Sequence, residues 1–326
     1  MHRGNAFTEV PLEQAFSDFE SVRICAFKPK GWERQALARR VDSGELVRPM
    51  PGMYARAAYW NGLSRPERLL HVVKTESICH PSWTFTHATA ALVHGLDVSH
   101  DLLWPIHYAT SRSGGGKASA HFVHHRFTDA ETTCVDDIRV TCLAQTAVDC
   151  ARTYPFGLAL AIADSALHGG LVTRDDLTAC ISAQPGRRGN KLARRVMALA
   201  SPLPESGGES LVRALMMDLG LPEPQLQAPI ERLGGRGDPY RVDFLFSDED
   251  AGGTSPVAFE LDGIGKYADE GLTGGRSMAR VFTDERQREA EITAKGIRVM
   301  RLRFDQAIRP EILLSRLAEY GIHPKG

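Results

Sequence analysis

The last third of the chain carries the pattern that most restricts its fold. A helix is expected over 209–219, where Leu211 and Leu215 lie one turn apart and Gly220 follows as a stop. Three strands follow at 227–232, 241–246 and 256–261, then a helix at 278–294, a strand at 297–302 and a helix at 310–320. This αβββαβα order predicts a mixed sheet flanked by helices.

Two of these strands place an acid between apolar residues. Val242, Phe244 and Phe246 are expected on one face of their strand, which puts Asp243 on the other. Glu260 and Asp262 alternate with apolar residues in the next strand. A buried acid is costly unless it is paired or bound to a metal. If the two strands pair, the three carboxylates gather on one patch beside the sheet.

Such a patch would suit a divalent cation. Carboxylate oxygens are ligands for Mg²⁺ or Mn²⁺ rather than Zn²⁺, and an ion among them would relieve their mutual repulsion. Glu209, at the head of the preceding helix, is a candidate to join the cluster. Ser206-x-x-Glu209 is also a capping box, which explains Glu209 without any chemistry.

The front of the chain has the order of a winged helix-turn-helix. A helix is expected over 32–42 with Leu37 and Val41 on its apolar side, Gly44 stops it, and a hairpin follows over 46–55. A local excess of basic residues accompanies this helix, and the candidate DNA contacts are Lys30, Arg34, Arg39 and Arg40. The alternative is a solvated helix face on a small structural domain.

The middle of the chain is expected to be mixed α/β. Strands are predicted near 104–110, 121–126 and 138–141, and helices near 143–152, 156–168 and 173–181. The chain therefore reads as an α/β (α+β multi-domain) protein in three parts. They are a winged helix-turn-helix over 1–61, a mixed α/β domain over 62–200 and the αβββαβ domain over 201–326.

Several histidines invite a metal interpretation. On a strand, His121 and His125 share one face and His124 lies on the other, without a nearby Cys or carboxylate in the sequence to complete a site. His87 and His94 are two helical turns apart, too far to chelate one ion alone. Surface or core roles are therefore expected for all of them.

Composition narrows the class of protein. The 326 residues carry 39 basic and 40 acidic side chains, which excludes a protein that coats nucleic acid but allows contact through local patches. The six cysteines form no C-x-x-C pair, so a zinc ribbon is not expected. The sequence has no apolar run of membrane-spanning length and its start has no apolar signal core, so a cytoplasmic protein without membrane partners is expected.

The last third also resembles a known family. Arg-Val-Asp243, Phe-Glu260-Leu-Asp262-Gly-x-x-Lys266-Tyr, Asp-Glu-Arg286-Gln-Arg288-Glu and Gly-Ile-Arg-Val-Met-Arg are similar to the motifs of the PD-(D/E)XK nuclease superfamily. The nearest branch is the one related to very-short-patch-repair (Vsr-like) endonucleases. The resemblance covers about residues 203–320.

This resemblance implies a Mg²⁺- or Mn²⁺-dependent DNA endonuclease. Asp243 and Glu260 would bind the metal, and Glu209 would assist. The sequence departs from the motif at Asp262, which takes the place of the lysine in E-x-K. Lys266 would then supply the missing positive charge, or Arg286 and Arg288 would do so as phosphate contacts. Without any of them, the fold is an inactive DNA-binding relic.

The first two thirds resemble a second family. Gly-Glu-Leu-Val-Arg-x-x-x-Gly-Met-Tyr-Ala at 44–55 and Thr-His-Ala-Thr-Ala-Ala-Leu-Val-His-Gly at 86–95 are similar to AbiEi-type antitoxins of type IV toxin–antitoxin systems. Those proteins are transcriptional repressors with an N-terminal winged helix. The resemblance implies DNA as a partner, and a cognate toxin as a second one.

Three functions are therefore open. The first is a DNA-binding protein with a metal-dependent endonuclease domain. The second is a non-enzymatic DNA-binding regulator or antitoxin with a degenerate nuclease fold. The third is a module that neutralises a protein toxin.

Overall fold

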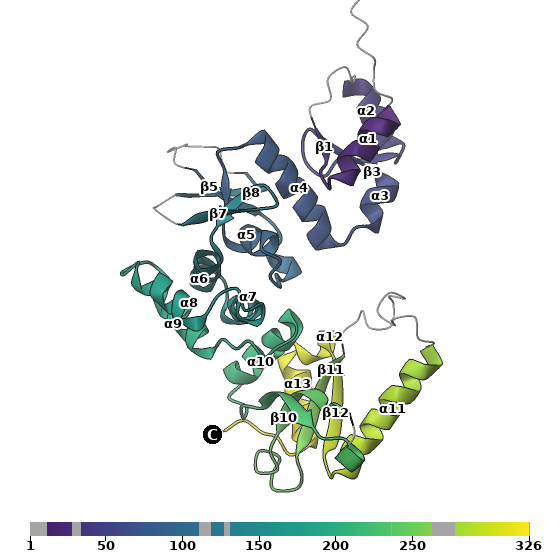
Figure 1. Ribbon diagram of the computed structural model, residues 1–326, viewed down its shortest axis with the longest axis vertical. Helices are drawn as coiled ribbons and strands as arrows, with labels where there is room; N and C mark the ends of the chain where they lie inside the picture. The colour runs from purple at the N-terminus through teal and green to yellow at the C-terminus, as the bar shows by residue number, and fades with distance from the viewer. Residues whose placement is uncertain are drawn as a thin grey trace, which may run out of the picture. The chain divides into compact units, whose positions relative to one another are not determined.

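A computed structural model describes residues 12–27, 34–110, 119–126, 131–235, 237–262 and 278–325. The chain divides into two compact units, residues 1–146 and 147–326 (Figure 1). The described part holds helices together with a three-stranded, a five-stranded and a four-stranded sheet. The expected α+β class is confirmed. None of the described helices is long and apolar enough to cross a lipid bilayer.

The first unit begins with a small helix-and-hairpin layer. Its elements are α1 (Leu12–Ser21), β1 (Ala26–Phe27), α2 (Arg34–Asp42), β2 (Leu46–Val47) and β3 (Met53–Arg56). The strands pair antiparallel in the order β1-β3-β2. The expected apolar side of α2 is confirmed, because Leu37 is buried beside Leu46 and Tyr54, with Val41 packed against them. Gly44 ends the helix with a φ of +78°, a conformation that favours glycine.

The rest of the first unit surrounds a five-stranded sheet. The helices are α3 (Ala57–Gly62), α4 (Arg65–Cys79), α5 (His87–Val93) and the short η1 (His100–Leu102). The strands are β4 (Thr84–Phe85), β5 (Ile106–Thr110), β6 (Phe122–Arg126), β7 (Thr132–Val135) and β8 (Ile138–Thr141), in the order β6-β5-β4-β8-β7. The predicted strands at β5, β6 and β8 are confirmed. The sequence pattern did not predict β4, which has two residues, or β7, which is mostly exposed.

Helices lead from this sheet into the second unit. They are α6 (Leu143–Thr153), which crosses the boundary between the units, α7 (Phe156–His168), α8 (Arg174–Ser182), α9 (Asn190–Leu199) and α10 (Gly207–Asp218). The helix predictions for α6, α7, α8 and α10 are confirmed to within two residues at each end. A buried ion pair joins α7 to α10, where Arg213 Nη2 lies 2.8 Å from Asp164 Oδ2.

The second unit contains the predicted mixed sheet. Its elements are β9 (Gln225–Ile230), η2 (Leu233–Gly235), β10 (Tyr240–Phe246), β11 (Val257–Asp262), α11 (Met278–Ala294), β12 (Arg298–Arg303), α12 (Phe304–Ala307) and α13 (Pro310–Glu319). The strand order is β12-β11-β10-β9. β11 and β12 run parallel, and the other neighbours are antiparallel. With α10 in front, the order αβββαβα is confirmed, apart from the one-turn α12.

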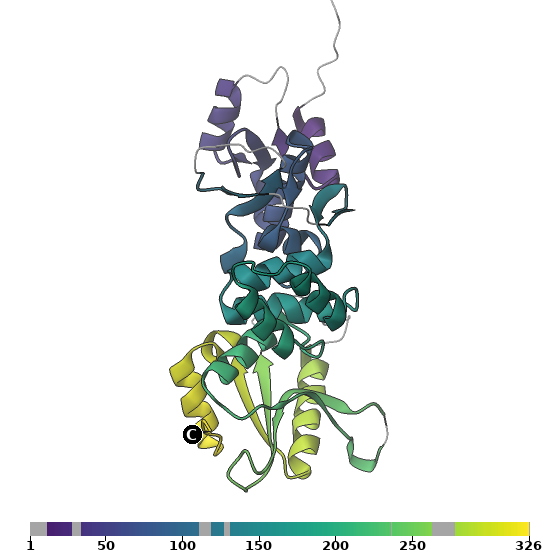
Figure 2. The ribbon, with the colours of Figure 1, turned by 90° about the vertical axis from the view of Figure 1, so that its left-hand side faces the viewer.

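Helices cover both faces of this sheet (Figure 2). Phe244 and Phe259 pack with residues of α13, whereas Val242 and Ala258 pack with Ile292 of α11. The expectation that Val242 and Phe244 share a face is therefore wrong. The alternation of β10 breaks between them, at Asp243.

Candidate nucleic-acid interface and carboxylate site

The break in the alternation of β10 lies opposite an irregular residue in the neighbouring strand, β9. Val242 pairs with Ala228 and Phe244 pairs with Leu226, but the step between these pairs, Asp243 opposite Gln227, is missing from the ladder. Gln227 has a φ of +47°, a left-handed conformation that is uncommon in a strand. The twist that this residue introduces is the physical reason for the break in alternation at Asp243.

A short chain of hydrogen bonds links four elements at this point, namely α10, β9, β10 and β11. Gln227 Nε2 donates to Glu209 Oε2 at 2.9 Å and to Asp243 Oδ1 at 3.4 Å. The backbone N–H of Leu261 donates to Asp243 Oδ2 at 2.8 Å. Asp243 is therefore held against both neighbouring strands, and the Gln227 amide stands between it and Glu209.

Glu209 is buried in the first turn of α10, which Ser206 caps. The backbone N–H of Glu209 donates to Ser206 Oγ at 3.2 Å, and the Ser206 hydroxyl donates back to Glu209 Oε1 at 2.8 Å. The N–H of Glu205 donates to Glu209 Oε2 at 2.9 Å. Burial raises the pKa of Glu209, and the nearby charge of Asp243 raises it further. The capping alternative therefore accounts for most of its contacts.

Glu260 faces arginines rather than the other acids. It is 7% exposed, and its Oε1 lies 2.6 Å from Arg288 Nη2 on α11. Its Oε2 lies 3.3 Å from Arg301 Nη2 on β12. Glu285 contacts both arginines as well. Burial raises the pKa of Glu260, and the two guanidinium groups oppose that shift.

The carboxylates expected to gather do not form a ready metal site. Among the described residues, no three of Glu209, Asp243, Glu260 and Asp262 bring ligand atoms within 4.8 Å of one another. Asp262 is half-buried at the end of β11. The reason is the break at Asp243 together with the ion pairs of Glu260. The donors around these acids do not fit Mg²⁺ or Mn²⁺ as they stand.

The structure places the basic residues expected to contact a DNA phosphate in different surroundings. Arg288 is engaged by Glu260 and Glu285, so it is not an open phosphate contact. Arg286 is exposed on α11. Lys266 lies outside the described residues.

The helix-and-hairpin layer formed by α1, β1, α2, β2 and β3 has basic residues on α2 and in the β2–β3 turn. Arg39 is exposed near the end of α2, and Arg40 Nη1 lies 2.9 Å from Glu45 Oε1 in an exposed pair. Arg34 begins α2, and Lys30 lies outside the described residues. Arg48 is exposed in the turn between β2 and β3. Sequence reasoning missed this residue, although a basic residue at the turn of a predicted hairpin was a usable signal.

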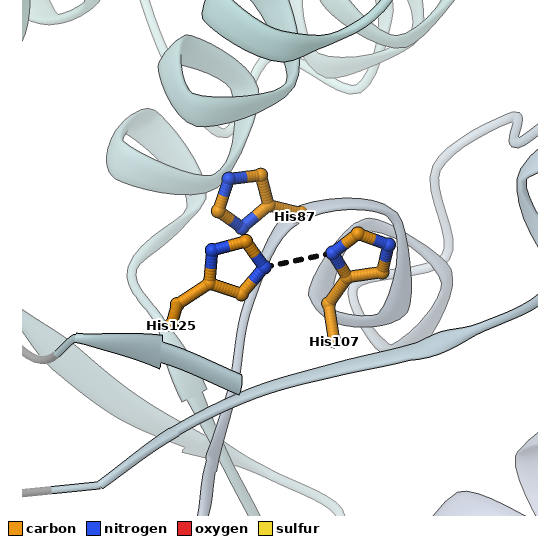
Figure 3. A group of neighbouring side chains, drawn as sticks. All are labelled: His87, His107 and His125. Carbon is orange, nitrogen blue, oxygen red and sulfur yellow. Dashed lines mark hydrogen bonds between the residues drawn. The ribbon is translucent and has the colours of Figure 1, made fainter. Parts of the chain in front are cut away.

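Three histidines of the first unit converge, which sequence spacing did not indicate. His87, His107 and His125 each place one ring nitrogen within 4.8 Å of the others (Figure 3). His107 Nδ1 and His125 Nε2 are 2.8 Å apart, and the His87 and His125 rings stack with centroids 3.9 Å apart. His94 and His124 point elsewhere, the first to the Thr141 carbonyl and the second to the Thr110 hydroxyl.

Comparison with known proteins places the chain in a family. No family model matches it, and no solved structure does. It is 32% identical over 215 residues to "Uncharacterized protein Rv2248" of Mycobacterium tuberculosis strain ATCC 25618 / H37Rv, across 66% of this chain and 75% of that protein. The chain belongs to the family of this protein. "Uncharacterized protein MT2308" of strain CDC 1551 / Oshkosh matches with the same identity and coverage. Neither name states an activity, so the function of the family has to be inferred from geometry.

Proposed function

We propose that this chain is a DNA-binding protein that contacts the duplex through α2 and the β2–β3 hairpin. The observation that carries the proposal is the three-stranded sheet β1-β3-β2 with α2 directly before the hairpin. In a winged helix, this arrangement presents one helix to the major groove and the hairpin to the neighbouring backbone. The resemblance of residues 44–55 to winged-helix repressors supports the same function.

The charges on these two elements fit phosphate contacts. Arg39 and Arg48 are exposed, one on the helix and one in the hairpin turn. Arg40 forms an exposed pair with Glu45, and such pairs contribute little, so a phosphate can compete for the guanidinium. A nearly neutral chain can bind DNA in this way because affinity depends on local charge.

The second unit favours a non-enzymatic regulator, such as an antitoxin, over an enzyme. The carboxylate of Glu260, the residue expected to bind the metal, lies against Arg288 and Arg301. These two positive charges occupy the electrostatic role that a cation would take. The αβββαβ fold then contributes binding surface or rigidity rather than cleavage.

A second candidate is metal-dependent hydrolysis of DNA phosphodiester bonds. The observation in its favour is the neighbourhood of Asp243 and Glu209, where the charge of one raises the pKa of the other. Two repelling carboxylates favour the binding of a cation. The motif resemblance around Asp243 and Glu260 supports this candidate as well.

A salt titration tests DNA binding. The DNA is a mixed-sequence duplex of ~30 base pairs, which spans several helical turns. Its binding to the full chain is followed by fluorescence anisotropy at increasing KCl. Replacing both Arg39 and Arg48 with Ala should weaken binding and reduce the slope of log K against log salt by about 0.9 for each lost contact. Arg139→Ala is the matched control, since Arg139 is an exposed arginine on β8 in the same unit. An unchanged slope in the double variant would refute the proposed interface.

Plasmid nicking separates the two candidates. Supercoiled plasmid is incubated with the full chain and Mg²⁺ or Mn²⁺, with EDTA as the blank. The regulator is supported by duplex binding without nicking under any metal. Nicking that requires metal and disappears in Asp243→Asn would establish the endonuclease in its place.

A further inference from the structure

The histidine cluster of the first unit is assembled by three separate elements. His107 lies on β5 and His125 on β6, and the parallel register pairs Ala109 with His125. Because residues 107 and 109 share a face, His107 and His125 lie on the same side of the sheet. His87 opens α5, directly after β4, which pairs with β5. Figure 3 shows the three rings side by side.

The backbone around the cluster is fixed by hydrogen bonds. The N–H of Thr86 donates to the carbonyl of His107 at 3.1 Å, and the N–H of His107 donates to Thr89 Oγ1 at 2.8 Å. His87 itself has a φ of +52°, which is strained for a residue with a side chain. Such strain is maintained only where the surrounding structure imposes it, and it gathers at functional sites.

The burial of His107 suits a ligand role. Burial and, to a smaller extent, the neighbouring His125 lower the pKa of His107 to about 4. The neutral imidazole ring is the form that binds metals. A site for phosphate or another anion would instead need protonated rings.

We propose that His87, His107 and His125 form a binding site for a transition-metal dication of the Zn²⁺ class. Zn–N bonds of about 2.0–2.1 Å in a tetrahedral site place the ligating nitrogens about 3.3 Å apart. His107 Nδ1 and His125 Nε2 lie 2.8 Å apart, and one ring nitrogen of each histidine lies within 4.8 Å of the others, so small movements reach that geometry. Imidazole donors select Zn²⁺, Cu²⁺ or Ni²⁺ over Mg²⁺ and Ca²⁺.

Metal binding rearranges two contacts of the cluster. For both lone pairs to face the ion, the ring that donates the hydrogen bond between His107 Nδ1 and His125 Nε2 would carry its proton on its other nitrogen instead. The His87 ring turns out of its stack on His125, because stacked rings direct their lone pairs along parallel planes. Among the described residues the group contains only these three histidines, so the fourth position takes a water.

Titration with Co²⁺ and Zn²⁺ tests the site. The full chain is stripped with a chelator, and Co²⁺ is added while the visible d–d absorption of tetrahedral cobalt is followed. Zn²⁺ is then added as a competitor, and Mg²⁺ serves as the negative control. We expect one Co²⁺ per chain, displaced by Zn²⁺ and not by Mg²⁺. A wild-type chain that binds neither Co²⁺ nor Zn²⁺ would overturn the proposal.

Variants assign the binding to the cluster. Replacing a ligand should weaken Zn²⁺ affinity by more than the ~10–100-fold that outer-shell changes produce. His87→Ala and His125→Ala are preferred because both side chains are half-buried, so folding is less at risk than at His107. His125→Cys keeps a ligand atom and should restore binding, which a purely structural role would not explain.

His124→Ala is the matched control. His124 is the neighbour of His125 on β6, but it is exposed and contacts the Thr110 hydroxyl. It should bind Zn²⁺ like the wild type. Equal loss of affinity in His124→Ala and His125→Ala, or wild-type affinity in folded His125→Ala, would overturn the assignment.

Discussion

The ion pairs of Glu260 make a quantitative prediction. Glu260→Gln removes the charge and keeps the size of a side chain that is 7% exposed. The variant leaves the guanidinium groups of Arg288 and Arg301 without the partner that lies 2.6 and 3.3 Å away. If Glu260 were an acid waiting for a metal, the same change would relieve repulsion and leave stability unchanged or raised.

The structure sets the size of the effect. Removing one partner of a fully buried ion pair costs about 3–5 kcal/mol. Here the arginine side chains are 21% and 26% exposed, and Glu285 remains in contact with both. The expected loss of unfolding free energy is therefore about 2–3 kcal/mol. For a unit of this size, that corresponds to a fall in Tm of about 4–12 °C.

Calorimetric unfolding with and without Mg²⁺ measures this loss. The control is Glu319→Gln, which breaks an exposed pair with Arg316 and should cost less than about 1 kcal/mol. Wild type should not respond to Mg²⁺, because Glu260 is already paired. A Glu260→Gln variant as stable as Glu319→Gln would refute the ion-pair reasoning. A Mg²⁺-dependent rise in the wild-type Tm that Glu260→Gln abolishes would favour the metal.

Three further predictions concern the scaffold. Asp164→Asn should destabilise the chain by about 3–5 kcal/mol in urea unfolding, since it leaves Arg213 buried without a counter-charge, and replacing both residues with apolar ones should recover much of the loss. Burial lowers the pKa of His71 below 6.5, so the unfolded chain takes up the proton first as the pH falls. The wild type should therefore lose up to about 1.4 kcal/mol per pH unit below pH 6.5 relative to His71→Gln, and a constant difference between the two would contradict this. Gly189→Ala should cost about 2–4 kcal/mol, because the new Cβ would lie 2.3 Å from the Arg152 carbonyl oxygen at a φ of +84°, and an unchanged melting curve would argue against that contact.

Much of the secondary structure follows from local sequence. The apolar run at 156–168 and the Gly stops after α2 and α10 indicate helices whatever they pack against, because helical hydrogen bonds join residues four apart. Strand alternation located β10 and β11 for a similar reason. The order of these elements was enough to predict the mixed sheet of the second unit.

The sites were decided by tertiary structure. The sequence around Gln227 does not predict its left-handed backbone conformation. Yet this residue lies opposite Asp243, where the alternation of side chains along β10 breaks. The partners of Glu260 lie 28 and 41 residues further along the chain, at Arg288 and Arg301. Local pattern identifies an acid in a strand, but only packing decides whether a cation or a guanidinium neutralises it.

The histidines also show which features local sequence predicts and which depend on tertiary structure. Spacing within one element correctly separates His87 from His94 and His124 from His125, because a helix and a strand each have a fixed period. The cluster of His87, His107 and His125 instead depends on β5 pairing with both β4 and β6. Strand pairing depends on contacts between residues far apart in the sequence. The period within one helix or strand therefore could not predict that these three side chains lie together.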